Sequence, residues 1–156
     1  MKLILTRHGE TIENQNKIVQ GHLPGKLSKE GIQQAKKLAL RLKDEKLDYI
    51  YSSDLARAAD TAKEILKYHP DTSIEFVEEL REGDLGSFTG KNKKDIDWNN
   101  RPGDMEPRES MRKRVKKLLD SVYTKHPNAT ILFVGHNGIN KALISVILNK
   151  PAEYME

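Results

Sequence analysis

Two histidines in this sequence stand where an imidazole could act on a ligand. His8 lies in the stretch LTRHGETIEN, residues 5–14, and His136 lies in VGHNG, residues 134–138. Each follows a short apolar run of the kind that forms a strand, and a nearby glycine lets the backbone approach a ligand closely. A neutral imidazole can attack an electrophile or carry a proton. The pair therefore indicates a catalytic site.

Two arginines supply the positive charge that an anionic ligand needs. Arg7 directly precedes His8, and Arg57 lies in SSDLARAADTA, residues 52–62, where Ser53 is the expected N-cap of a helix. A cation in the first turn opposes the helix dipole, so Arg57 needs a partner. Asp54 is one candidate, although such a pair contributes only about 0.2–0.5 kcal/mol. The other is a phosphoryl group bound by Arg7 and Arg57 together, because guanidinium groups match phosphate oxygens bidentately.

Glu82, in ELREGDLG, follows the third expected strand and precedes an irregular segment. A carboxyl group held among apolar neighbours at such an edge could serve as a general acid. The alternative is that Glu78, Glu79 and Glu82 are solvated loop charges. The local sequence leaves both interpretations open.

The remaining histidines serve as a contrast. His69 and His126 each precede a proline at the end of a helical pattern, where an imidazole suits the negative end of the helix dipole. We interpret both as structural. His22, in the loop sequence QGHLPG, is a candidate contact to substrate at the mouth of the site.

Strand and helix patterns alternate along the chain. Apolar and β-branched runs predict strands at residues 2–6, 48–52, 73–77 and 130–135, and apolar residues at helical spacing predict helices after Ser28 and across 55–66, 111–122 and 139–147. Strands separated by single helices indicate crossover connections, a mainly parallel sheet and helices on both of its faces. Ligands bind at the carboxyl ends of the strands in such sheets, which is where His8 and His136 fall.

The segment from residue 86 to 108, GSFTGKNKKDIDWNNRPGDMEPR, interrupts this alternation. Polar residues, glycine and proline dominate it, which predicts a long surface loop or lid. Its side chains either touch the leaving group of a substrate or are simply solvated; they include Lys91, Lys93, Lys94, Trp98 and Arg101. With no internal repeat and no linker, we expect residues 1–156 to form a single domain.

The composition limits the classes of function. The 156 residues contain no cysteine, which excludes disulfides, a cysteine nucleophile and cysteine metal ligands. The net charge of +4 suits anionic partners, but the basic residues are spread over helices, so no nucleic-acid partner is expected. No run approaches the ~20 apolar residues that cross a bilayer, so we expect no membrane partner and a cytoplasmic protein.

Several ordered blocks resemble the histidine phosphatase superfamily, also called the phosphoglycerate mutase-like proteins. The blocks extend from Leu5 to about Leu148; they are RHGETIEN, LSKEGIQQA, SSDLARAADTA, LREGDLGSFTG and VGHNG. The sequence looks most like the α-ribazole phosphatases and broad-specificity phosphatases of that family. It departs from the pattern at Thr89, where the family often has an acidic residue, and in lacking a further strand after the last helix.

The resemblance implies a three-layer α/β/α sandwich and a metal-independent phosphomonoesterase without cofactors, monomeric or homodimeric, acting on a small phosphorylated metabolite. By position, His8 would be the nucleophile that forms a phosphohistidine, and Glu82 the general acid and base. The residues implied to bind the phosphoryl group are Arg7, Arg57, Asn14, His8 and His136. The candidate contacts to the rest of the substrate are Gln20, Gly21, His22 and Asn137.

Three alternatives remain. A phosphoglycerate mutase-type transfer would return the phosphoryl group to substrate, but mutases usually carry a longer insertion and tail that exclude water. A metal-dependent hydrolase could use His8, His136, Asp54 and Glu82 as ligands, although arginines beside a divalent cation are unfavourable. A non-catalytic phosphate-binding module would have no need of Glu82 or a second histidine.

Overall fold

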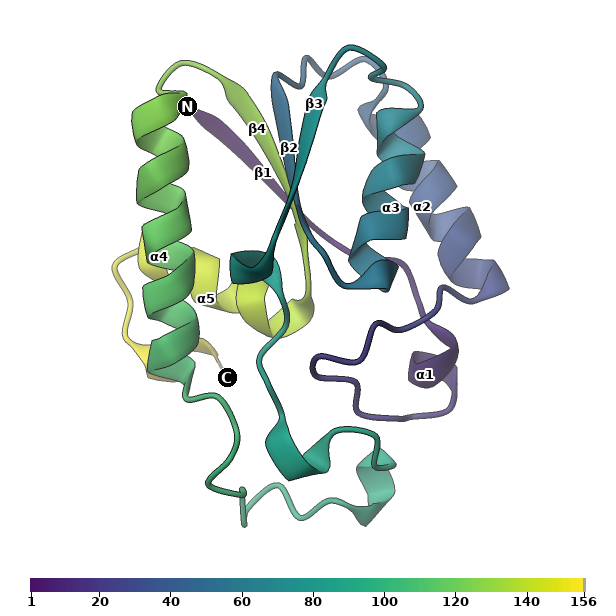
Figure 1. The fold of residues 1–156 in the computed structure, drawn as a ribbon, viewed down its shortest axis with the longest axis vertical. Coiled ribbons are helices and arrows are strands. Elements are labelled where there is room, and N and C mark those ends of the chain that lie inside the picture. The colour runs from purple at the N-terminus through teal and green to yellow at the C-terminus, as the bar shows by residue number, and fades with distance from the viewer. Residues whose placement is uncertain (156) are drawn as a thin grey trace.

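The computed structural model describes residues 1–155 as a parallel sheet between helices (Figure 1). The strands are β1 (Lys2–Arg7), β2 (Tyr49–Ser53), β3 (Ser73–Val77) and β4 (Thr130–Gly135). The helices are α1 (Ile12–Gln15), α2 (Lys29–Leu42), α3 (Ala56–Leu66), α4 (Arg108–Lys125) and α5 (Asn137–Ile147). Short 3₁₀ helices lie at Glu78–Leu80 (η1), Gly86–Phe88 (η2), Lys93–Asp95 (η3) and Ala152–Met155 (η4).

Helices cover both faces of the sheet, which confirms the predicted α/β architecture. Helices α2 and α3 pack together on one side, and α4 and α5 pack on the other (Figure 1). Strand β4 is buried after its first residue and faces both layers. Ile131 and Phe133 join the cluster with α4 and α5, and Leu132 and Val134 join the cluster with α2 and α3. Burial on both faces explains its continuous apolar run.

The order of the strands, β1-β4-β2-β3, is what positions the site. All neighbours are parallel, and β4 lies between β1 and β2. In the register of β1 and β4, Arg7 is opposite Gly135, so the residues that follow these strands emerge side by side. Within residues 1–155, η4 is the only regular element after α5.

The sequence predicts N-capping serines for two helices, and the structure confirms one of them. Ser28 caps α2 as predicted, because its Oγ accepts a hydrogen bond from the Gly31 amide at 3.0 Å. The prediction that Ser53 is the N-cap of α3 is wrong. The helix begins at Ala56 with Leu55 as the capping residue, and Ser53 is still in β2. Its Oγ accepts from the Leu55 amide at 3.2 Å and is turned toward another partner described below.

The segment predicted as a loop from 86 to 108 is partly ordered by local contacts. It contains η2 and η3, and α4 begins at its last residue, Arg108. The segment is tied to the first third of the chain by a bridge between Ile18 and Asn92 and by a small apolar cluster of Val19, Phe88 and Ile96. These contacts fix it beside the loop that follows α1.

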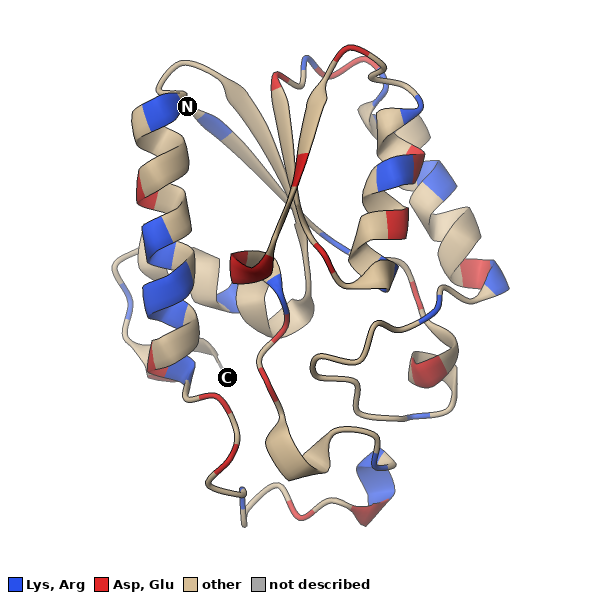
Figure 2. Ribbon diagram, viewed as in Figure 1, with Lys and Arg blue, Asp and Glu red and all other residues tan. Residues whose placement is uncertain are grey.

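Charged residues are spread over the helices and loops, as the sequence indicated. Figure 2 shows lysine and arginine on α2, α3 and α4 with acidic residues between them, whereas the strands carry few charges. Among residues 1–155, no helix has the length and apolarity needed to span a bilayer.

Candidate active site

His8 and His136 lie together beyond the carboxyl ends of β1 and β4. The His8 amide donates to the Gly135 carbonyl at 3.1 Å, which continues the pairing of the two strands by one residue. The two imidazole rings are 5.1 Å apart between centroids and tilted by 56°. Two parallel neighbouring strands thus bring together side chains that are far apart in the sequence.

The hydrogen bonds of His8 define which ring nitrogen is free to react. Its Nδ1 lies 2.6 Å from the carbonyl oxygen of Gly9, which only accepts, so Nδ1 carries the proton. Nε2 then has a lone pair, and the Arg57 Nε–H donates to it at 3.3 Å. Burial, together with the charges of Arg57 and Arg7, lowers the pKa of His8 to about 3. His8 is therefore a neutral imidazole at pH 7 with Nε2 as its basic atom.

Arg57 is buried beneath this site, with 1% of its surface exposed. Besides His8, its guanidinium donates to the carbonyls of Leu23 and Pro24 through Nη1, and to that of Gly21 through Nη2 at 3.0 Å. A guanidinium has five N–H donors, so one Nη2–H remains beside Nε. Burial lowers the pKa of Arg57 to about 10, which leaves it charged at pH 7. The edge that can meet a phosphoryl group is therefore Nε and Nη2.

Ser53 is the partner of His136. The His136 side chain is fully buried, and its Nε2 lies 2.9 Å from Ser53 Oγ. Ser53 Oγ already accepts the Leu55 amide, so its hydroxyl proton is available to donate to Nε2. That assignment puts the ring proton of His136 on Nδ1, which has no hydrogen-bond partner. Burial lowers the pKa of His136, so the ring is neutral with an unused Nδ1–H donor.

Ser53 is a residue that the sequence reading missed as part of the site. We expect Ser53→Ala to lower kcat/KM for a phosphate ester about three- to tenfold, because a net hydrogen bond contributes about 0.5–1.5 kcal/mol. The loss should be accompanied by weaker inhibition by vanadate, since the imidazole of His136 would no longer be held in place by Ser53. Ser52→Ala is the matched control, because Ser52 is equally buried and its Oγ bonds only the Ser53 carbonyl at 2.9 Å. An equal loss in both variants would indicate general damage to β2.

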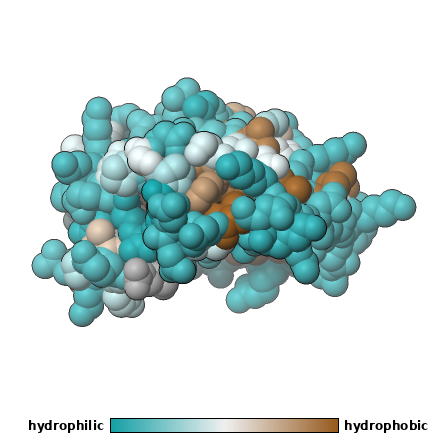
Figure 3. Space-filling model, turned by 90° about the horizontal axis from the view of Figure 1, so that it is seen from below, coloured by the Kyte–Doolittle hydropathy of each residue, from teal (hydrophilic) through white to brown (hydrophobic). Residues whose placement is uncertain are grey.

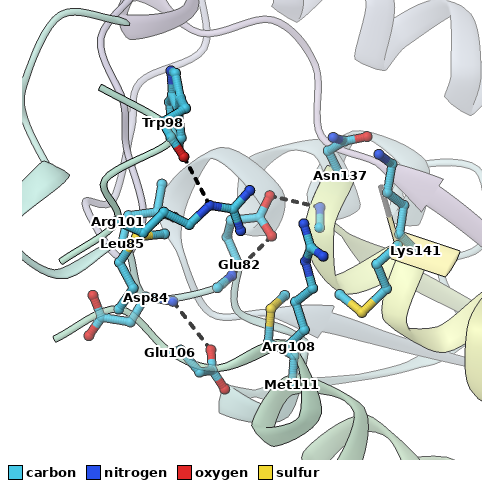
Figure 4. A pocket seen from close by; sticks show the side chains of 14 residues that line it. Glu82, Asp84, Leu85, Trp98, Arg101, Glu106, Arg108, Met111, Asn137 and Lys141 are labelled. Carbon is cyan, nitrogen blue, oxygen red and sulfur yellow. Dashed lines mark hydrogen bonds between the residues drawn. The ribbon is translucent and has the colours of Figure 1, made fainter. Parts of the chain in front are cut away.

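The carboxylate of Glu82 lies at the N-terminus of α5, the helix that follows His136. Its Oε1 accepts the amides of Gly83 and Ile139 at 3.0 and 3.1 Å, and its Oε2 accepts the amide of Gly138 at 3.0 Å (Figure 4). The Glu82 carboxyl is therefore held by backbone N–H groups, two of them at the N-terminus of α5, which the local sequence did not indicate. Oε2 accepts a single hydrogen bond and keeps a lone pair on which a proton can sit.

The main-chain carbonyl of Glu82 is also held. His22 Nε2 lies 2.8 Å from it, and Arg114 Nη2 donates to it at 3.1 Å. Arg114 also forms an ion pair with Glu106 at 2.8 Å. His22, predicted as a substrate contact, thus holds the main chain of Glu82 in this structure.

A polar hollow of about 420 Å³ opens beside His8. Its lining is Arg7, His8, Glu10, Asn14, Gln34 and Lys93. Arg7 and Asn14 therefore lie beside His8, as the resemblance implied; Asn14 Oδ1 accepts the Thr11 amide at 3.1 Å. Gln34 was missed, although it stands in the quoted block LSKEGIQQA; its Oε1 accepts the Glu10 amide at 2.9 Å.

The other candidate substrate contacts fall in two places. Gln20 is buried with its Oε1 unpartnered, and Gly21 offers its carbonyl to Arg57, so both lie on the Arg57 side of the site. Asn137 is exposed and lines a second hollow on the other side of Glu82.

Two glycines allow the loop that carries His8 to pack against α2. A Cβ on Gly9 would lie 2.4 Å from the Gly31 carbonyl oxygen, and a Cβ on Gly31 would lie 1.9 Å from that of Glu10. Real Cβ contacts are never so short, so the backbones meet here because neither residue has a side chain.

The proposed metal ligands do not converge. Arg81 donates to both carboxylate oxygens of Asp54, at 2.8 and 2.5 Å, and this lowers the pKa of Asp54. The alternative pairing of Asp54 with Arg57 is therefore also wrong. Within residues 1–155, no three His, Asp or Glu side chains form a group that could hold a metal ion. The hypothesis of a metal-dependent hydrolase finds no ligand set in this part of the chain.

Known proteins match this sequence over most of its length. Residues 3–156 match the family model described as the histidine phosphatase superfamily (branch 1). The chain is 30% identical to the adenosylcobalamin/alpha-ribazole phosphatase of Salmonella typhimurium, over 97% of this chain and 82% of the relative. It is 30% identical to a metal-independent phosphoserine phosphatase of Arabidopsis thaliana, over 91% of this chain and 66% of the relative. The solved structure of Bacillus stearothermophilus YhfR superposes with a TM-score of 0.90 at 29% identity, covering 98% of this chain and 82% of that one.

Proposed function

Because the chain belongs to the histidine phosphatase superfamily, branch 1, we propose that it is a metal-independent phosphomonoesterase that acts on small phosphorylated metabolites through a phosphohistidine intermediate. The observation that carries this proposal is the state of His8. Its Nδ1–H is held by the Gly9 carbonyl, and its neutral Nε2 faces the guanidinium of Arg57. An imidazole fixed in this tautomer beside a buried cation is prepared to attack an anionic electrophile.

In the first step, His8 Nε2 forms a bond to phosphorus and the bond from phosphorus to the leaving oxygen breaks. The Arg57 Nε–H bond to Nε2 must be given up, because the lone pair is needed for attack. Nε and the remaining Nη2–H of Arg57 then face the phosphoryl oxygens. Arg7 and the Nδ1–H of His136 add further donors, and Asn14 lies beside them. Such preorganised positive charge supplies most of the rate in phosphoryl transfer.

Glu82 acts on the leaving group. A proton on its Oε2 would pass to the departing oxygen, which then leaves as a neutral alcohol. In the second step, the carboxylate takes a proton from a water molecule that attacks phosphorus, and the bond to His8 breaks. Inorganic phosphate is released, and both His8 and Glu82 return to their starting states.

The named relatives support a phosphatase on small metabolites. One is called an adenosylcobalamin/alpha-ribazole phosphatase and another a metal-independent phosphoserine phosphatase. A mutase remains the alternative within the family, because one similar solved structure is a phosphoglycerate mutase from Bacillus anthracis, with a TM-score of 0.83 at 27% identity. The two differ in whether water or a second alcohol receives the phosphoryl group.

The test is a panel of phosphomonoesters assayed with and without EDTA. We expect inorganic phosphate to appear at the same rate in both, because arginine and histidine supply the positive charge at the site. Loss of activity with EDTA and recovery with a divalent cation would contradict the metal-free mechanism. Isomerised phosphoglycerate in place of inorganic phosphate would identify a mutase.

A further inference from the structure

A second hollow, of about 390 Å³, lies on the far side of Glu82 from the polar hollow beside His8. It is formed by the loop after η1, the segment from 98 to 106 and the first turns of α4 and α5 (Figure 4). The carboxyl group that would protonate the leaving oxygen is part of its wall. A general acid must lie within hydrogen-bond reach of the atom that it protonates. The second hollow is therefore where the rest of the leaving alcohol would extend.

Much of the lining of this hollow is apolar. The apolar side chains are Leu85, Trp98, Met105, Met111 and Met155. Trp98 is 41% exposed although its ring packs edge-on against Phe88, with centroids 5.6 Å apart. Seen from the end of the molecule where the strands finish, hydrophobic residues show between hydrophilic ones (Figure 3). Flexible methionines beside a fixed aromatic ring suit a flat or branched apolar body.

Two of the cations around the hollow are not paired with its carboxylates. Its acidic side chains are engaged: Glu106 with Arg114, Asp84 with the Gly86 amide, and Glu82 with three backbone amides. Lys141 on α5 has no hydrogen bond or ion pair among residues 1–155. Arg101 also forms no ion pair there and donates only to the Trp98 carbonyl, at 3.4 Å. Lys141 and Arg101 thus line a partly apolar hollow without forming an ion pair within residues 1–155.

We propose that this hollow binds the leaving alcohol, and that the alcohol carries a ring-sized apolar body and an anionic group of its own, which Lys141 and Arg101 hold. This inference rests on the proposed phosphatase activity and names the substrate class for the same site. The volume falls within the range of pockets that enclose such ligands. The phosphoryl group of the substrate would lie on the His8 side of Glu82 and the second anion on the Lys141 side.

The test compares three alkyl phosphates that differ in the leaving group: ethyl phosphate, benzyl phosphate and 4-carboxybenzyl phosphate. The two benzylic alcohols have similar basicity, so a difference between them reports binding in the hollow and not chemistry at phosphorus. We expect kcat/KM to rise from ethyl to benzyl and again, about tenfold, from benzyl to 4-carboxybenzyl phosphate, as one charged hydrogen bond would give.

Two variants and a control test whether Lys141 and Arg101 cause the preference for 4-carboxybenzyl phosphate. Lys141→Met and Arg101→Gln should each reduce the ratio of kcat/KM for 4-carboxybenzyl over benzyl phosphate. Lys94→Met should preserve that ratio, because Lys94 is an exposed cation in η3, shortly before that segment, and does not line the hollow. A ratio near one in the unmodified protein, or a high ratio that neither variant lowers, would overturn the inference while phosphatase activity stands. Failure to hydrolyse any of the three esters would instead overturn the proposed function.

Discussion

Replacing His8 by alanine should abolish turnover of every phosphomonoester, with a loss of at least about 10⁴-fold in kcat, the scale seen when a hydrolase loses its nucleophile. The same variant should trap no acid-labile phosphate in a rapid quench, whereas the unmodified protein should trap it. The physical reason is that His8 combines a neutral Nε2, with its pKa lowered to about 3 by burial, and an Nδ1–H held by Gly9.

His136→Ala and His126→Gln provide the matched comparisons. His136→Ala should slow turnover but still trap phosphate on His8, because His136 contributes an Nδ1–H donor and not the attacking atom. His126→Gln should leave turnover intact, since His126 stacks on Tyr49 at 3.8 Å at the far end of the sheet. Phosphate that persists in His8→Ala and disappears in His136→Ala would exchange the two roles.

Replacing Glu82 by glutamine should cost about 10²- to 10⁴-fold on an alkyl phosphate, the usual contribution of a general acid. The loss should be far smaller for a nitrophenyl phosphate, because a stabilised phenolate leaves without a proton. The comparison should use single-turnover release of alcohol and of phenolate. Multiple turnovers would mix in the second step, in which Glu82 is proposed to activate water.

Glu82→Gln also changes the hydrogen bonds around residue 82, and the experiment must separate that effect from the loss of the proton donor. An amide NH₂ in place of Oε2 would face the Gly138 N–H, and one in place of Oε1 would face the N–H groups of Gly83 and Ile139, so at least one of the three hydrogen bonds is lost. That disturbance is shared by both leaving groups, whereas the missing proton is not. Glu79→Gln is a neighbouring control that should change neither rate. Equal losses for the two esters in Glu82→Gln would remove Glu82 from the acid role.

The fold could be predicted because a strand that is buried on both faces has a continuous run of apolar residues in the sequence. Strand β4 reads as TILFVG, and its unbroken apolar run is what a parallel strand between two helical layers requires. The boundary at Ser53 was not predictable in the same way. A serine before a helix usually caps it, but tertiary contact with His136 holds this one in β2.

The sequence could predict that His8 and His136 lie together, but it could not predict the hydrogen bonds of the candidate site. His8 and His136 could be placed together from their positions after two expected parallel strands. The environment of Glu82 could not, because its three backbone donors come from its own loop and from an α5 that is more than fifty residues away in sequence. Nor could local sequence show that Asp54 pairs with Arg81, which leaves Arg57 to bind the loop carbonyls.

The central place of β4 has a consequence for biosynthesis. β1 is the first of the four strands to be made, yet among residues 1–155 it pairs only with β4, which is the last of them. At 5–20 residues per second, the nascent chain carries an unpaired β1 for roughly 6–25 s. During that time β1 has no partner strand to pair with. Pairing between β1 and β4 is also slow once both are made, because they are far apart in the sequence. Residue His136 follows β4 directly, so the pairing of β4 with β1 also brings His136 beside His8, the arrangement on which the proposed activity depends.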